Sequence, residues 1–95
     1  MTTAPQFEWD KSKAARNLQK HQVSFEEAAT VFDDPNFITV IDEEHSGDEE
    51  RYITIGVSQL ARILMVAHTD RGGHIRIISA RKATRQEMRF YAKAE

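Results

Sequence analysis

Hydrophobic positions near the N-terminus follow the spacing of amphipathic helices. Asp10 can cap a helix over residues 11–21, because its side chain can accept a hydrogen bond from the first backbone amides. Ser24 and Glu27 have the S-x-x-E spacing of a capping box and surround the start of a further apolar run. The pattern therefore predicts two successive helices, the second ending at about Phe32.

A third helix is predicted at the C-terminus. Thr84 and Glu87 repeat the capping-box spacing, so this helix should cover about residues 85–93. The second helix should stop at residues 33–36, because proline disfavours helical backbone in the residue before it and turn-forming residues follow.

Between these helices, the apolar positions follow strand-like patterns rich in β-branched and aromatic residues. They predict strands at residues 37–41, 51–57, 60–69 and 74–81, with FEW at residues 7–9 as a candidate short edge strand. An acidic loop (42–50) and a DRGG turn (70–73) separate strands. We therefore expect one α+β domain over residues 1–95, in which a four-stranded antiparallel meander packs with two N-terminal helices and one C-terminal helix.

The composition agrees with a soluble protein. The chain has 95 residues, of which 40% are hydrophobic and 29% charged, and no cysteine for a disulfide or a thiolate zinc site. No apolar run approaches the roughly 20 residues that a membrane span requires, and the N-terminus lacks the order of a signal peptide. We expect a cytoplasmic protein without a membrane association.

Charge is divided unevenly along the chain. Residues 1–50 hold four Lys and Arg against twelve Asp and Glu, a balance of −8, whereas residues 51–95 hold nine against three, a balance of +6. The second half could therefore build a basic surface for phosphates or for an acidic partner, or the two halves could neutralise each other in the fold.

The strand pattern places several cations near one another. If residues 70–73 form an even loop, Arg62 lies directly opposite Arg81, on the same face of the sheet as His68. Two guanidinium groups in that position would suit a phosphate. If the loop is odd, Arg76 joins Arg62 and His68 instead, and the pattern does not choose between these registers.

More cations follow this strand. Lys82 precedes the last helix, whose N-terminal amides are a further anion site, and Arg85 and Arg89 share one helical face. Tyr91 lies on the packed face of that helix and is more typical of a core residue.

The sequence resembles the BrnT toxins of bacterial type II toxin–antitoxin pairs. The matching segments cover nearly the whole chain: FEWD, KHQVSFEEAATVFDDP, DEEHSGDEERYITIG and RIISARKATRQEMRFY. Gln22 and Ala61 stand where glycine is usual in that family, which concerns turn geometry. The resemblance implies a fold similar to RelE-type ribonucleases, RNA cleavage without a metal, and hetero-oligomeric neutralisation by a BrnA-type antitoxin with a ribbon-helix-helix DNA-binding part.

Such cleavage needs a proton acceptor for the 2′-hydroxyl, a cation for the phosphorane and a proton for the leaving oxygen. We assign catalysis to Arg62, Arg81 and His68, and RNA binding to Arg76, Lys82, Arg85 and Arg89. The resemblance adds Lys20, His21, His45 and Tyr91 as secondary candidates, although His45 is more typical of a loop-ordering residue. The acidic loop has no recognisable cation-binding spacing, and no cofactor motif is present.

Two functions fit these observations. The first is a ribonuclease toxin acting on RNA, and the second is a non-catalytic module that uses its basic face to bind nucleic acid or an acidic protein. A proton-transfer residue close to the arginines would distinguish them.

Overall fold

The computed structural model describes residues 6–93 as an α+β fold, as predicted. In chain order the elements are β1 (Gln6–Glu8), α1 (Lys11–His21), α2 (Phe25–Thr30), the 3₁₀ turn η1 (Val31–Asp33), β2 (Ile38–Ile41), β3 (Tyr52–Val57), β4 (Ile63–Arg71), β5 (His74–Lys82) and α3 (Arg85–Lys93). Among these, no helix is long and apolar enough to cross a membrane.

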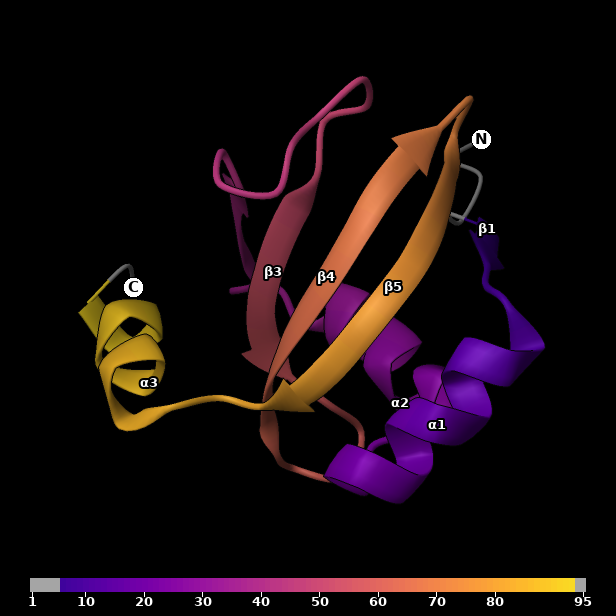
Figure 1. Cartoon of the computed structure of the whole chain (residues 1–95). Coiled ribbons are helices and arrows are strands. Elements are labelled where there is room, and N and C mark those ends of the chain that lie inside the picture. The colour runs from indigo at the N-terminus through magenta and orange to yellow at the C-terminus, as the bar shows by residue number, and fades with distance from the viewer. Residues whose placement is uncertain (1–5, 94–95) are drawn as a thin grey trace, which may run out of the picture.

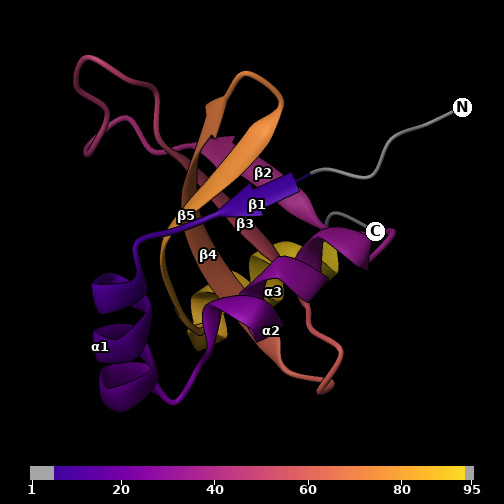
Figure 2. The ribbon, with the colours of Figure 1, turned by 90° about the vertical axis from the view of Figure 1, so that its right-hand side faces the viewer.

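The sheet has five strands in the order β1-β5-β4-β3-β2. Strands β2 to β5 form the predicted antiparallel meander. The short N-terminal strand β1 joins its edge beside β5 (Figures 1 and 2). The two strands run parallel, with Phe7 opposite Ile75. The sheet is therefore mixed, because the first strand pairs with the last.

The helices occupy different sides of this sheet. Helix α2 lies behind β4 and β5, α1 stands beside the edge of β5, and α3 lies at the opposite side near β3 (Figure 1). The main core joins the sheet to α2 and the segment before it; its fully buried members include Val23, Phe25, Val31, Leu64, Val66 and Ile77. A second, smaller cluster forms under α3 around Ile55, Met65 and Tyr91.

Several boundaries differ from the prediction, and those of α2 and β4 are the clearest. Helix α2 ends at Thr30, and the η1 turn covers the residues that were expected to extend it. Strand β4 begins at Ile63 rather than Leu60, because Ala61 adopts a left-handed conformation (φ 61°) in a turn closed by its backbone N–H to Ser58 O. Leu60 is thereby exposed at the turn.

The last hairpin has an even loop, one of the two alternatives considered, but the supposed pairing of Thr69 with His74 is wrong. Gly72 and Gly73 alone form the turn, both with positive φ, so that Arg71 rather than Thr69 lies opposite His74. A register shift between Ala67 and His68 then changes the pairing further along the ladder.

This register separates the arginines. Met65 lies opposite Arg81, and Thr69 lies opposite Arg76, so both arginines point to the face that α3 shares. Arg62 instead contacts Glu27 of α2 behind the sheet. The expected facing of Arg62 with Arg81, and its alternative with Arg76, are both wrong.

The close packing of β3 against η1 predicts a stability change at Gly56. A Cβ there would lie 2.9 Å from Val31 Cγ1 and 3.1 Å from Phe37 Cβ. We expect Gly56→Ala to lower the free energy of unfolding by about 1–3 kcal/mol, measured by urea denaturation. Gly47→Ala is the control, since nothing lies within 4 Å of its Cβ; equal stability of both variants would contradict the packing.

A second prediction concerns the left-handed residue Ala61. Glycine adopts this conformation without the steric cost of a Cβ. Ala61→Gly should therefore raise the melting temperature and increase the free energy of unfolding by up to about 1 kcal/mol. The control is Ala15→Gly in the exposed face of α1, where glycine should cost about 1 kcal/mol. The same sign for both substitutions in thermal unfolding would argue against this backbone account.

Candidate active site

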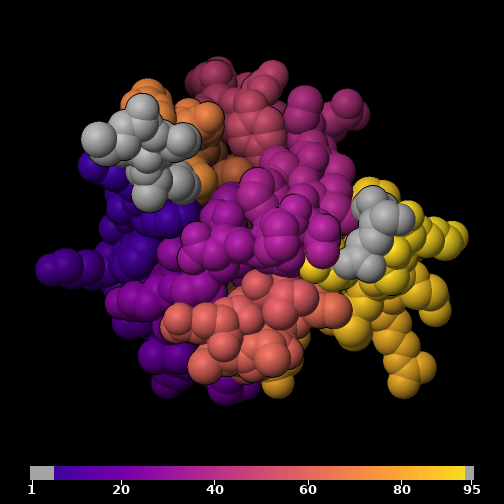
Figure 3. Space-filling model, turned by 180° about the vertical axis from the view of Figure 1, so that it is seen from behind, coloured from indigo at the N-terminus to yellow at the C-terminus, as the bar shows by residue number. Residues whose placement is uncertain are grey.

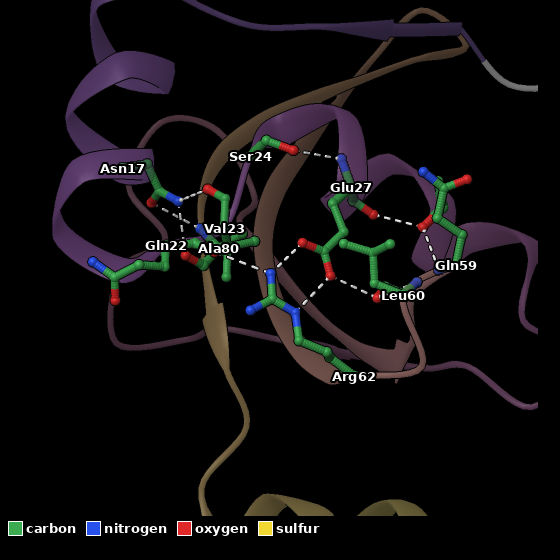
Figure 4. Close-up of polar contacts among 11 residues, drawn as sticks. Asn17, Gln22, Val23, Ser24, Glu27, Gln59, Leu60, Arg62 and Ala80 are labelled. Atoms are coloured by element: carbon green, nitrogen blue, oxygen red, sulfur yellow. Dashed lines mark hydrogen bonds and ion pairs between the residues drawn. The ribbon is translucent and has the colours of Figure 1, made fainter.

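A buried carboxylate organises the lower end of the sheet. Glu27, only 4% exposed, accepts hydrogen bonds from Arg62 through Nε (2.9 Å) and Nη2, and from Ser58 Oγ (2.7 Å), as Figure 4 shows. The hydrogen bond from Arg62 lowers the pKa of Glu27 below its ordinary value, while Glu27 raises the pKa of Arg62. The Glu27–Arg62 pair therefore holds Arg62 in a defined position at the candidate site.

The capping box at α2 is only half formed, which frees Glu27 for this role. The Glu27 backbone N–H donates to Ser24 Oγ at 3.0 Å, but its carboxylate turns to Arg62. At α3 the box is reciprocal, because Thr84 N–H donates to Glu87 (2.9 Å) and Glu87 N–H donates to Thr84 Oγ1 (3.1 Å). The sequence spacing therefore found the cap of α2 but missed the ion pair.

Arg62 also connects to α1. Its Nη2 donates to the backbone carbonyl of Gln22 at 3.0 Å, directly after Lys20 and His21. Lys82, at the end of β5, is close enough for its charge to lower the pKa of Glu27. Arg62, Lys82 and the C-terminal end of α1 thus meet at one end of the sheet.

A groove of about 300 Å³ lies between α1 and β5. Its lining consists of Lys13, Arg16, Asn17, Lys20, His21, Ile78 and Ser79. Within residues 6–93, no carboxylate forms an ion pair with any of its Lys or Arg side chains. Helix α1 contains no acidic residue. The groove is therefore a basic surface, although residues 1–50 together carry a negative net charge.

Asn17 fixes the walls of this groove. Its amide nitrogen donates to the carbonyls of Val23 and Ala80, each at 2.9 Å, and its oxygen accepts from the Ala80 N–H at 3.1 Å. The side chain therefore satisfies both backbone groups of one residue on the free edge of β5. These hydrogen bonds hold α1 against β5 and replace those that a neighbouring strand would make to Ala80.

The other predicted arginines lie elsewhere. Arg81 donates to both carboxylate oxygens of Glu87, at 2.8 and 3.0 Å, and so joins β5 to α3. Arg76 lies 4.0 Å from Glu8 of β1, while Arg85 and Arg89 are exposed on α3.

His68 is a buried neutral side chain rather than a partner of the arginines. It is 5% exposed, and burial lowers its pKa to about 4. His68 follows Arg62 by six residues, which corresponds to roughly 20 Å at the rise of an extended strand. The structure therefore does not bring Arg62, Arg81 and His68 together.

Two of the secondary candidates have structural contacts. His45 Nδ1 lies 2.9 Å from Asp42 Oδ2, which confirms the expected loop-ordering contact. Tyr91 is buried, and its hydroxyl donates to Asp34 at 2.5 Å. Asp42 and His45 also lie near Glu44, but an exposed acidic group of this kind is common without a metal.

Comparison with known proteins identifies the family. A family model described as the ribonuclease toxin BrnT of a type II toxin–antitoxin system matches residues 9–87. The chain belongs to the BrnT family. The resemblance read from the sequence motifs is thereby confirmed, and the chain is a ribonuclease toxin with RNA as its substrate and an antitoxin protein as its partner.

A solved structure agrees at the level of the fold. The BrnT ribonuclease toxin of Brucella abortus, known from a crystal structure at 1.1 Å resolution, superposes with a TM-score of 0.62 and 20% sequence identity. The match covers 86% of this chain and 100% of the other. No curated protein matches the chain significantly in sequence.

The ion pair predicts how stability of this BrnT chain depends on pH. Because the pKa of Glu27 is lowered in the folded state, its contribution is present above its ordinary pKa and is lost as pH falls through the folded value. Glu27→Gln should lower the free energy of unfolding at pH 7 by about 1–3 kcal/mol and flatten the acidic part of the stability profile.

Glu26→Gln is the matched control, since Glu26 is exposed on the same turn of α2. The free energy of unfolding of both variants is measured by urea denaturation between pH 3 and 7, and only Glu27→Gln should change its dependence on pH. If the Glu27–Arg62 pair behaved like an exposed surface pair, the two variants would give the same profile.

Proposed function

We propose that this BrnT toxin is a metal-independent endoribonuclease that cleaves RNA in the cytoplasm by transesterification and thereby inhibits translation and growth. The observation that supports the proposal is the basic groove between α1 and β5, whose lining residue His21 directly precedes Gln22, the residue whose carbonyl binds Arg62. RNA phosphates would lie along the groove, and the scissile phosphate would lie at its end, near Arg62.

The reaction requires one proton to be removed and one to be supplied. The 2′-oxygen forms a bond to phosphorus, the bond to the 5′-oxygen breaks, and the products are a 2′,3′-cyclic phosphate and a 5′-hydroxyl. We assign proton transfer to His21, because imidazole can accept the 2′-hydroxyl proton and then protonate the leaving oxygen. His21 lines the groove and lies one residue before the carbonyl that binds Arg62.

Arg62 is positioned to stabilise the charge of the phosphorane. Nε and Nη2 are held by Glu27 and Gln22, whereas Nη1 has no partner among the described residues and is drawn without one in Figure 4. A guanidinium fixed in this way loses little freedom on binding phosphate. Lys20 and Lys82 would add positive charge beside it.

The remaining arginines take other parts in this proposal. Arg76, Arg85 and Arg89 would contact RNA phosphates outside the groove and raise affinity without selecting a sequence. Arg81 is bound by Glu87 on the other face of the sheet, so it is assigned to joining α3 to the sheet. His68 is not assigned to proton transfer, because it is buried and neutral.

Inhibition is proposed to come from a BrnA-like antitoxin. A ribbon-helix-helix protein of that type would form a hetero-oligomer with the toxin and keep RNA from the groove. Expression of the toxin alone should then arrest growth.

The assignment is tested with purified toxin, free of antitoxin, and a labelled RNA in EDTA. We expect cleavage to products with 2′,3′-cyclic phosphate ends, and His21→Gln should lower the rate by about 10²- to 10⁴-fold. Arg62→Ala should impair cleavage as well, whereas His74→Gln is the control, because His74 is exposed at the β4–β5 turn.

The outcomes distinguish the assignments. Full activity of His21→Gln with loss in Arg81→Ala would move the site to the other face of the sheet. Salt-dependent RNA binding without products in the wild type would instead support the non-catalytic binding module.

A further inference from the structure

A second cavity lies at the opposite end of β4 from Arg62. It measures about 350 Å³, and its lining is mostly aromatic and apolar: Phe32, Phe37, Thr39, Tyr52, His68, Asp70 and Ile75. The segments that supply these residues meet on the upper part of the back face of the molecule (Figure 3). The basic groove between α1 and β5 shares none of these residues.

The aromatic rings of this pocket are packed on one another. Tyr52 stacks on His68 with a centroid distance of 5.7 Å and an interplanar angle of 25°. Phe32 meets His68 edge-on at 5.1 Å and Phe37 at 5.7 Å. The walls therefore offer ring faces in a fixed arrangement, which suits a flat or cationic group.

His68 is a buried member of the lining and is held by hydrogen bonds. His68 is 5% exposed, its Nε2 lies 2.7 Å from Thr54 Oγ1, and Thr54 lies 2.7 Å from Thr39 Oγ1. The hydrogen bonds through Thr54 and Thr39 therefore hold the His68 ring in the wall of the pocket.

The surroundings of the pocket are anionic. Asp70 lies in the lining and forms no ion pair within residues 6–93, and the Tyr52 hydroxyl donates to Glu50 at 2.7 Å. The acidic loop 42–50 is tied to the β4–β5 hairpin by Arg71, which donates to Glu49 at 2.9 and 3.1 Å. Such a field repels RNA phosphates and attracts a cation.

We propose that this aromatic pocket receives the guanidinium of an arginine from a basic segment of the antitoxin. The rings of Phe32 and Tyr52 would contact its face, and Asp70 would offset its charge. The inference rests on the antitoxin partner of the proposed function, and it gives that partner a docking point separate from the RNA groove.

The chemistry of the pocket is tested directly by NMR. N-acetyl-arginine N-methylamide is titrated into the toxin while the aromatic ¹H–¹³C signals of Tyr52 and His68 are followed. We expect saturable shifts, and binding about 5- to 30-fold weaker for the uncharged citrulline analogue and for Asp70→Asn. Glu26→Gln, which neutralises an exposed acid of α2 outside the pocket, should bind like the wild type.

The role in docking is tested with the cognate antitoxin. Asp70→Arg should require at least about ten-fold more antitoxin for half-inhibition of RNA cleavage, with unchanged cleavage in its absence. Unchanged inhibition would overturn docking at this pocket. Equal binding of the citrulline analogue, preferential binding of adenosine or uridine, or no shift with any probe would overturn the arginine assignment.

The two proposals fail in different ways. A toxin without ribonuclease activity would contradict the proposed cleavage mechanism, but the NMR titration would still show whether the pocket binds arginine. Conversely, an active enzyme whose aromatic signals do not respond to arginine would contradict only the docking site.

Discussion

The fold around the candidate site depends on one buried carboxylate. Glu27 is almost fully buried. Burying a charge lowers the stability of the fold unless an opposite charge and hydrogen bonds compensate for it. Arg62 and Ser58 supply them from the turn before β4, and Arg62 also bonds the end of α1. One ion pair thereby joins the start of a central strand to α2 and to the C-terminal end of α1.

Opposite ends of the sheet carry opposite chemistry. At one end, α1 contributes cations without acids, and Asn17 holds it along the unpaired edge of β5. At the other end, Asp70 and the acidic loop surround an aromatic pocket. A toxin that binds RNA and is neutralised by a protein can use this separation, because phosphates and a basic partner are attracted to different places.

Much of the fold could be predicted from the sequence, whereas the grouping of the site residues could not. The capping spacings at Ser24 and Thr84 marked helix starts because a cap is a local contact within four residues. The two-glycine turn and the register shift at Ala67 were not visible, because a strand pattern does not fix where pairing begins. Without the register shift, the alternation of side chains along the strands places Arg62 and Arg81 on the same face.

The sequence by itself determined the family, the α+β class and the number and order of the main elements, since these follow from local spacing, turn residues and specific motifs. Only the tertiary structure decided which charges are neutralised and which stay free. The acids of the first half gave no sign that Glu27 would be taken by Arg62, or that α1 would face the solvent with unpaired cations. Charge pairing depends on distances between segments far apart in the chain, and those distances exist only after the sheet has formed.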